Sequence, residues 1–286
     1  MSEHTAAGGP LGVAVGQFAP GADSEANIAE ITRMTLIAAE RGASLVVFPE
    51  YSSYFTPTMG PDWVEAAQSL DGRFVQALTA IADDTGCHIV AGLVELSETP
   101  SRVRNTVVAV APQHGLVAKY RKMHLYDAFG STESEWVEPG PSTGSEAEPE
   151  VFDVAGMRVG LQTCYDIRFP EVTRRLVDAG AELVLVPAEW VRGPLKEHHW
   201  RTLCTARALE NTVFLAAADH MPPIGVGNSF VIDPMGVELV TIGDAHEVAV
   251  AWITRERLLA VRTINPALEL RRFGVVPRDA PSLPHR

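Results

Sequence analysis

The sequence is poor in cysteine. Cys87, Cys164 and Cys204 are the three cysteines among 286 residues, they lie far apart, and none belongs to a CxxC pair. An odd and widely spaced set argues against a disulfide framework and against a zinc knuckle. We therefore expect three free thiols.

Excess positive charge and long apolar runs are also missing. The chain has 23 Lys and Arg against 36 Asp and Glu, a net charge of -13, and no basic stripe. Such a protein repels phosphate backbones, so nucleic acid and membrane are excluded as partners. The opening "MSEHTAAGGP" lacks the basic start and apolar run of a signal peptide, and no stretch is long enough to cross a bilayer. We expect a cytoplasmic protein.

The remaining composition is that of a globular domain. Hydrophobic residues make up 46% of the chain, which is ample for a buried core. No linker rich in Pro, Gly or Ser divides the chain, and no repeat is visible. We predict one domain over residues 11–275, a flexible N-terminal segment at 1–10 and a C-terminal tail at 276–286.

Strand and helix patterns alternate through both halves of the chain. Compact apolar runs predict strands, and apolar residues at helical spacing predict helices. Strands are expected at 11–18, 44–50, 88–96, 105–112, 116–122, 157–164, 182–190, 213–219 and 247–254, with a hairpin turning at 234–236. Helices are expected at 28–42, from an N-cap at Asp71 to Gly86, at 169–180 and at 198–211. This order predicts an α/β fold in which two β layers pack face to face and helices cover their outer sides.

One segment interrupts this pattern. Residues 130–150 contain Pro139, Gly140, Pro141 and Pro149, which are incompatible with regular structure. Long loops of this kind in a compact domain are usually functional. We expect this segment to form part of the wall of a site.

Three reactive side chains stand at the ends of predicted strands. Glu50 closes "LVVFPE", Lys122 follows "AKYR", and Cys164 closes "VGLQTC" just before a helix. Taken singly, each has an ordinary explanation as a solvated cap or a small buried thiol. Because ligand sites of α/β sheets gather beyond the carboxyl ends of strands, the three groups are also expected to meet in one pocket.

A carboxylate, an ammonium and a thiol suffice for acyl transfer. Glu50 would take the proton of the Cys164 thiol and later pass it to a leaving amine. Lys122 would favour the thiolate and stabilise the oxyanion, helped by the backbone N–H of Tyr165. The start of the following helix would also favour the thiolate.

The three motifs "LVVFPE", "YRKMHLYD" and "CYDIRFPE", in this order, resemble the Glu-Lys-Cys triad of the nitrilase superfamily, the carbon-nitrogen hydrolases. The resemblance implies a four-layer α-β-β-α sandwich, usually assembled as a homodimer or a larger homo-oligomer. It also implies a second glutamate after the lysine motif. Glu133 in "STESEWVEPG" matches that pattern, and Glu135 and Glu138 are nearby alternatives.

The residues after the cysteine resemble one branch of the superfamily. The segment "CYDIRFPE" is similar to the amidases that include omega-amidases and deaminated glutathione amidases, which act on carboxylate-bearing amides. Arg168 would bind such a carboxylate, or it pairs with Asp166 or Glu171 as a structural ion pair.

A second segment, "PAEWVRGP", follows a predicted strand and departs from the smaller, uncharged residues of that branch. Glu189 and Trp190 are expected to line the pocket, although core packing is an alternative for Trp190.

The sequence therefore predicts a cysteine amidase whose small-molecule substrate is a linear amide. Two alternatives remain: an N-carbamoyl amide hydrolase, and a non-catalytic metabolite-binding or scaffold protein with a redox-sensitive Cys164. We expect no metal, because His198 and His199 are adjacent and carry no metal-binding spacing. We also expect no cofactor, since "GGPLG" does not sit between a strand and a helix as a phosphate loop does.

Overall fold

The computed structural model describes residues 9–142, 144 and 147–276. The predicted terminal segments fall largely outside this range, because residues 1–8 and 277–286 are not among the described ones. The statements below concern the described residues.

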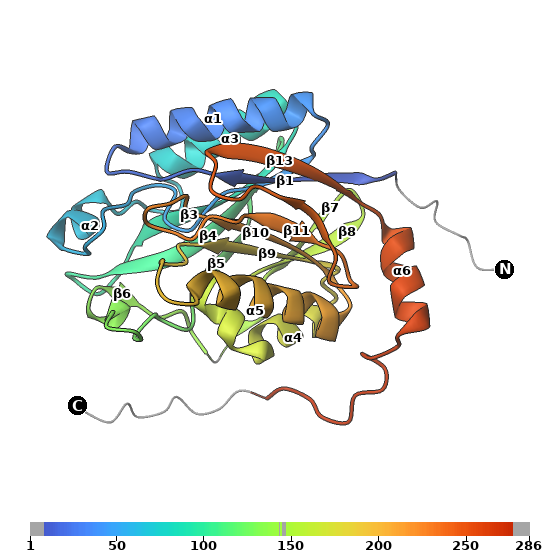
Figure 1. Cartoon of the computed structure of the whole chain (residues 1–286). Coiled ribbons are helices and arrows are strands. Elements are labelled where there is room, and N and C mark those ends of the chain that lie inside the picture. The colour runs from blue at the N-terminus through green and yellow to red at the C-terminus, as the bar shows by residue number, and fades with distance from the viewer. Residues whose placement is uncertain (1–8, 143, 145–146, 277–286) are drawn as a thin grey trace.

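Two mixed sheets form the centre of the fold (Figure 1). The first has the order β13-β1-β2-β3-β4-β5, with β6 paired to β4. Its strands are β1 (Leu11–Gln17), β2 (Leu45–Val47), β3 (His88–Leu96), β4 (Val103–Ala111), β5 (Gly115–Arg121), β6 (Val137–Glu138) and β13 (Glu247–Ile253). The second has the order β12-β11-β10-β9-β8-β7. Its strands are β7 (Val151–Val154), β8 (Met157–Leu161), β9 (Leu183–Ala188), β10 (Phe214–Asp219), β11 (Phe230–Ile232) and β12 (Glu238–Thr241).

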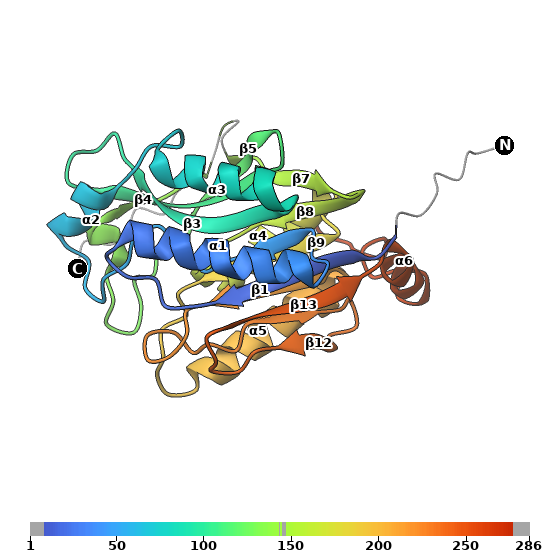
Figure 2. The same cartoon turned by 90° about the horizontal axis from the view of Figure 1, so that it is seen from above.

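Helices cover the outer face of each sheet. Helices α1 (Ser24–Glu40) and α3 (Arg73–Thr85) lie side by side over the first sheet, as both views show (Figures 1 and 2). Helices α4 (Pro170–Asp178) and α5 (Lys196–Asn211) cover the second sheet. Short helices α2 (Pro61–Ala66) and α6 (Arg255–Ile264) lie at opposite ends of the sandwich. The predicted four-layer α-β-β-α sandwich is confirmed.

Three apolar cores hold the layers together. The central core joins the facing sheets, with Val47 and Val107 on one side and Leu161 and Leu185 on the other. A second core packs α1 and α3 on the first sheet, and a third packs α4 and α5 on the second. Since both faces of the inner strands are covered, β1, β2, β9 and β10 are buried along their whole length. This is why they read as unbroken apolar runs rather than as alternating patterns.

Several sequence-based boundaries were wrong for local reasons. Strand β2 ends at Val47 rather than at residue 50, because Pro49 has no N–H to donate and Tyr51 has a positive φ of 57°. Helix α3 is capped by Gly72 and not by Asp71, whose carboxylate instead accepts a bond from the Ser69 hydroxyl. The segment 130–150 is not wholly irregular, since it contains a 3₁₀ turn, η1 (Glu133–Glu135), and strand β6. Helices α2 and α6 were not predicted.

The longest helices of the described chain are amphipathic and carry charges on their outer faces. Among the described residues, no helix is both long and apolar enough to cross a membrane.

Candidate active site

The three predicted reactive side chains lie just beyond strand ends of the two sheets. Glu50 follows β2 and Lys122 follows β5, both in the first sheet. Cys164 begins the 3₁₀ turn η3 (Cys164–Arg168), which follows β8 of the second sheet. Lys122 and Glu50 are 2% and 1% exposed, so neither is turned out toward solvent. The two sheets therefore supply different parts of one site.

A buried ion-paired network joins Glu50, Lys122 and Glu133. The Lys122 Nζ lies 2.9 Å from Glu50 Oε1 and 2.9 Å from Glu133 Oε2. Of the alternatives for the second glutamate, Glu138 binds Arg104 and Ser97, and Glu135 is exposed. Glu133 is thus the glutamate that holds the lysine.

Opposite charges fix the protonation of this network. Burial alone would lower the pKa of Lys122, but the carboxylates of Glu133 and Glu50 raise that pKa well above its ordinary value. Burial would likewise raise the pKa of Glu133, but Lys122, the Tyr51 hydroxyl and the backbone N–H of Tyr126 lower it. Lys122 is therefore a permanent cation between carboxylates.

The Cys164 thiol is neutral at rest. Burial raises its pKa well above the ordinary value, the charge of Glu50 raises it further, and Lys122 only partly opposes them. Burial and the nearby carboxylate thus oppose the thiolate that the start of the turn was expected to favour. The Sγ lies 3.6 Å from the backbone oxygen of Glu189, and Cys164 itself has a positive φ of 43°. A strained backbone at this position presents the thiol to the pocket.

Sequence reasoning missed several groups that orient these side chains. Asn105 donates to Glu50 Oε1 at 2.6 Å and to Glu133 Oε1 at 3.0 Å, and the Tyr51 hydroxyl donates to Glu133 Oε1 at 2.6 Å. Asp166 is fully buried and accepts the Tyr120 hydroxyl at 2.8 Å. It also forms a capping box with Thr163, directly before Cys164. The Thr-x-x-Asp spacing was the one signal in the sequence that could have revealed this support.

Gly92 of β3 allows the Glu50 turn to pack against the sheet. A Cβ atom at this position would lie 2.2 Å from the backbone N of Tyr51 and 2.6 Å from the carbonyl carbon of Glu50. Any side chain here would displace the backbone that carries the Glu50 carboxylate. The glycine is required by this close approach and not by its φ.

His220 forms a hydrogen bond with the backbone of Glu50. Its Nε2 lies 2.7 Å from the backbone oxygen of Glu50, so this nitrogen is the donor. Burial lowers the pKa of His220 to about 4, because the charged ring would lie desolvated in the core. The ring is neutral at pH 7.

This depressed pKa predicts an acid-sensitive fold. In the unfolded chain this histidine binds a proton near pH 6.5, whereas in the folded protein it does so only near pH 4. The stability of the fold that depends on a neutral His220 is therefore fully present above pH 6.5 and is lost as the pH falls from 6.5 towards 4. Between pH 7 and pH 5 we expect His220 to account for a loss of about 2 kcal/mol in the free energy of unfolding. Urea titrations of wild type and His220→Asn measure this, with the exposed His198→Asn as control. Equal pH dependence in all three proteins would contradict the assignment.

A cavity of about 500 Å³ contains Cys164 and Lys122. Segments near residues 51–63, 122–136, 189–192 and 223–224 line it, so the predicted wall from the 130–150 loop is present up to Trp136. Of the side chains predicted to bind substrate, Glu189 lines this cavity. Arg192, which sequence reasoning did not select, lines it as well and is exposed.

The other three predicted substrate-binding residues are not among those lining the cavity. Trp190 is 2% exposed and belongs to the core over the second sheet. The Arg168 guanidinium carbon lies 4.9 Å from the Trp190 ring centroid and 5.9 Å from that of Tyr165. The Arg168 Nη2 atom lies 3.3 Å from His199 Nδ1. Within the described chain Arg168 forms an ion pair with neither Asp166 nor Glu171.

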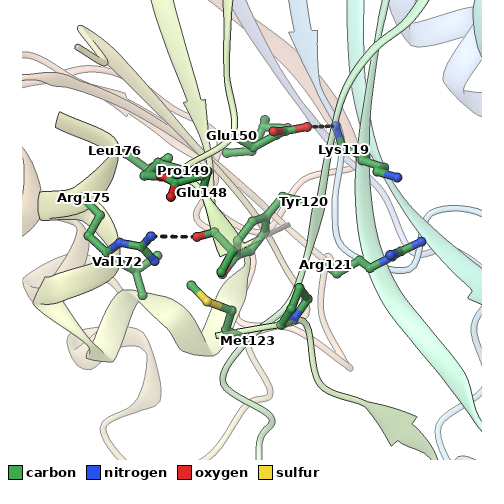
Figure 3. A pocket seen from close by; sticks show the side chains of 13 residues that line it. Lys119, Tyr120, Arg121, Met123, Glu148, Pro149, Glu150, Val172, Arg175 and Leu176 are labelled. Atoms are coloured by element: carbon green, nitrogen blue, oxygen red, sulfur yellow. Dashed lines mark hydrogen bonds between the residues drawn. The ribbon is translucent and has the colours of Figure 1, made fainter. Parts of the chain in front are cut away.

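A second cavity, of about 240 Å³, is lined by residues of β5, of the segment before β7 and of α4 (Figure 3). Tyr120 and Met123 face it, and it is bordered by two hydrogen bonds, from Arg175 to the Ala147 oxygen and from the Lys119 N–H to Glu150. None of the described residues that line it is a cysteine, serine or threonine. Within the described residues, no group of three or more His, Cys, Asp or Glu side chains is placed to hold a metal ion.

Comparison with known proteins agrees with this geometry. The carbon-nitrogen hydrolase family profile matches residues 12–263. The chain belongs to the carbon-nitrogen hydrolase family. It is 39% identical over 262 residues to a deaminated glutathione amidase of Escherichia coli, covering 92% of this chain and 97% of that protein. It is 29% identical over 259 residues to an omega-amidase of Mus musculus, covering 86% and 89%.

Solved structures of this hydrolase family share the fold. An amidase of Nesterenkonia, carrying the acetamide moiety of fluoroacetamide at its active-site cysteine, superposes with a TM-score of 0.73 at 27% identity, covering 92% of this chain and 98% of that one. The NitFhit protein of C. elegans gives a TM-score of 0.80 at 26% identity, covering 93% of this chain and 66% of that one. The predicted superfamily and the predicted enzyme class, an amidase, are confirmed, and the non-catalytic alternative is not supported.

Proposed function

We propose that this hydrolase cleaves the amide bond of a small, carboxylate-bearing linear amide through a thioester at Cys164, releasing an acid and ammonia. The observation that carries the proposal is the pocket in which Cys164 meets the Glu50–Lys122–Glu133 network. The names of its relatives, deaminated glutathione amidase and omega-amidase, support this substrate class.

The proposed reaction begins with a neutral thiol. As Sγ attacks the amide carbonyl carbon, Glu50 accepts the thiol proton, so the nucleophile is charged only when it reacts. The Lys122 ammonium and the backbone N–H of Tyr165 stabilise the oxyanion. Glu50 then gives the proton to the leaving nitrogen, and the C–N bond breaks to leave a thioester.

The second half of the reaction reverses these roles. Glu50 takes a proton from water, the hydroxide attacks the thioester carbonyl, and the C–S bond breaks. The Cys164 sulfur regains the proton from Glu50, and the acid leaves. Glu133 does not exchange protons in this scheme. Together with Asn105 it holds the Lys122 ammonium beside Glu50.

The charge distribution of the cavity supports a carboxylate at its mouth. Carboxyl groups surround the thiol, whereas the exposed guanidinium of Arg192 lines the cavity and has no ion-pair partner within the described chain. We assign the contact with the substrate carboxylate to Arg192, because a guanidinium binds a carboxylate in bidentate fashion. Arg168, selected from the sequence, stays a prediction that the same experiment tests.

A substrate panel tests the proposal. We expect 2-oxoglutaramate and deaminated glutathione to be hydrolysed with a kcat/KM roughly 10- to 100-fold above that of neutral aliphatic amides, the effect of one charge-assisted contact. Arg192→Leu should remove this preference and leave turnover of neutral amides unchanged, and Arg168→Leu serves as the comparison. Preference for N-carbamoyl amino acids, with carbon dioxide released beside ammonia, would favour the alternative hydrolase. Equal kcat/KM values for charged and neutral amides would contradict the proposal that the substrate bears a carboxylate.

We also propose a cytoplasmic homodimer. The three cysteines are free and buried, which suits a compartment that keeps the nucleophile reduced. Large apolar side chains are exposed in and after α6, notably Ile264, Leu270 and Phe273, and a second copy would cover them.

A further inference from the structure

The backbone of Glu189 contacts both Glu50 and Cys164, whereas its side chain makes no polar contact within the described chain. It follows β9, its N–H donates to Glu50 Oε2 at 2.6 Å, and its carbonyl oxygen lies 3.6 Å from the Cys164 Sγ. Its side chain lines the same cavity as Cys164 and Lys122. Within the described chain the Glu189 carboxyl has neither a hydrogen-bond nor an ion-pair partner.

An unpartnered carboxyl in the wall of a reaction pocket is available to the substrate. We propose that Glu189 is a specificity-determining residue whose neutral carboxyl donates a hydrogen bond to an uncharged oxygen at the reacting end of the amide. This inference rests on the proposed amide hydrolysis and deepens it. A substrate whose negative charge lies at the reacting end is excluded, and one whose carboxylate points to the cavity mouth is accepted.

The surrounding charges favour the neutral form of Glu189. The groups that surround it on the neighbouring elements are Glu50 and Tyr51 after β2, Lys122 after β5, Tyr126 and Glu133 in the following segment, Cys164 in η3, Arg192 after β9, Lys196 in α5 and Asp219 in β10. Burial raises the pKa of Glu189 well above its ordinary value, and the charges of Glu50 and Asp219 raise it further, against Lys122. Burial and the neighbouring carboxylates therefore favour the protonated form of this carboxyl.

The pH dependence of kcat/KM follows from the protonation of Glu189. As pH rises through the raised pKa of Glu189, the carboxyl loses its proton, ceases to donate, and adds a negative charge beside Glu50. Binding of the amide weakens, so kcat/KM falls on the alkaline side. A glutamine at position 189 keeps a donor of the same shape and does not ionise.

The experiment compares kcat/KM for 2-oxoglutaramate from pH 5 to pH 10 in wild type, Glu189→Gln and Glu189→Ala. Glu189→Gln should stay within about 3-fold of wild type at pH 7 and lose the alkaline fall that wild type shows. Glu189→Ala should raise KM about 10-fold, the loss of one hydrogen bond to the substrate. The exposed Glu197→Gln on α5 is the matched control and should reproduce the wild-type profile.

The outcomes separate this inference from the proposed function. Both backbone bonds of residue 189 persist in each variant, so a change in the pH profile reports the side chain. If wild type hydrolyses the amide and the Glu189→Gln profile superimposes on it, or Glu189→Ala keeps its KM, Glu189 does not contact the substrate. If wild type hydrolyses no amide of the panel, the proposed function fails instead.

Discussion

Alanine at position 164 should leave a folded protein that no longer turns over amides. We expect Cys164→Ala to reduce kcat by on the order of 10⁴-fold or more, because Cys164 provides the one thiol among the described residues that line the cavity. Intact-mass measurement with a slowly hydrolysed amide should show an acyl adduct on wild type and none on the variant.

A second buried thiol provides the control for this experiment. Cys204 in α5 is also free and fully buried, and burial raises its pKa as it does for Cys164. Cys204→Ala should keep both the adduct and the activity. An adduct on Cys164→Ala, or comparable turnover by that variant and wild type, would exclude the thioester route.

Methionine in place of Lys122 should cost both stability and activity. The substitution leaves the buried carboxylates of Glu50 and Glu133 without the cation between them, and breaking such a pair costs about 3–5 kcal/mol. We expect this loss in the free energy of unfolding from urea titrations at pH 7. Hydrolysis should fall below detection, because the oxyanion also loses its ammonium.

A double variant separates the two effects. Lys122→Met combined with Glu133→Gln removes one of the uncompensated charges, so part of the lost stability should return while activity stays absent. Lys119→Met, on a partly exposed neighbouring side chain, should change stability by less than about 0.5 kcal/mol. Full wild-type stability of Lys122→Met would show that the network is not held by charge.

The three candidate groups could be selected from the sequence because each follows a predicted strand, and for Glu50 and Cys164 that strand is a conspicuous apolar run. Glu50, Lys122 and Cys164 stand where a buried strand meets polar residues, and the layered fold brings such strand ends together. Glu133 came from the resemblance, because in isolation it reads as a surface charge on a loop. Its burial is visible only once the loop folds over Lys122.

The supporting groups could not be predicted, since their partners are distant in sequence. Asn105 binds a carboxylate 55 positions away, and His220 binds a backbone oxygen 170 positions away. Arg168 shows the limit from the other side: it lies close to the cysteine in sequence, and its guanidinium carbon lies 4.9 Å from the centroid of the Trp190 ring, a contact that its position in the chain did not reveal. Sequence distance gave no guide to spatial distance in either case.

The peptide unit of residue 189 has a consequence for how the enzyme is made. The N–H of this residue donates to Glu50, which lies 139 positions earlier in the chain, and its carbonyl oxygen accepts from Cys164. During translation Glu50 is synthesised first, Lys122 and Cys164 follow, and residue 189, which contacts two of them, comes last. A chain interrupted before β9 would contain Glu50, Lys122 and Cys164 but not the peptide unit that contacts two of them, and we expect such a chain to be inactive.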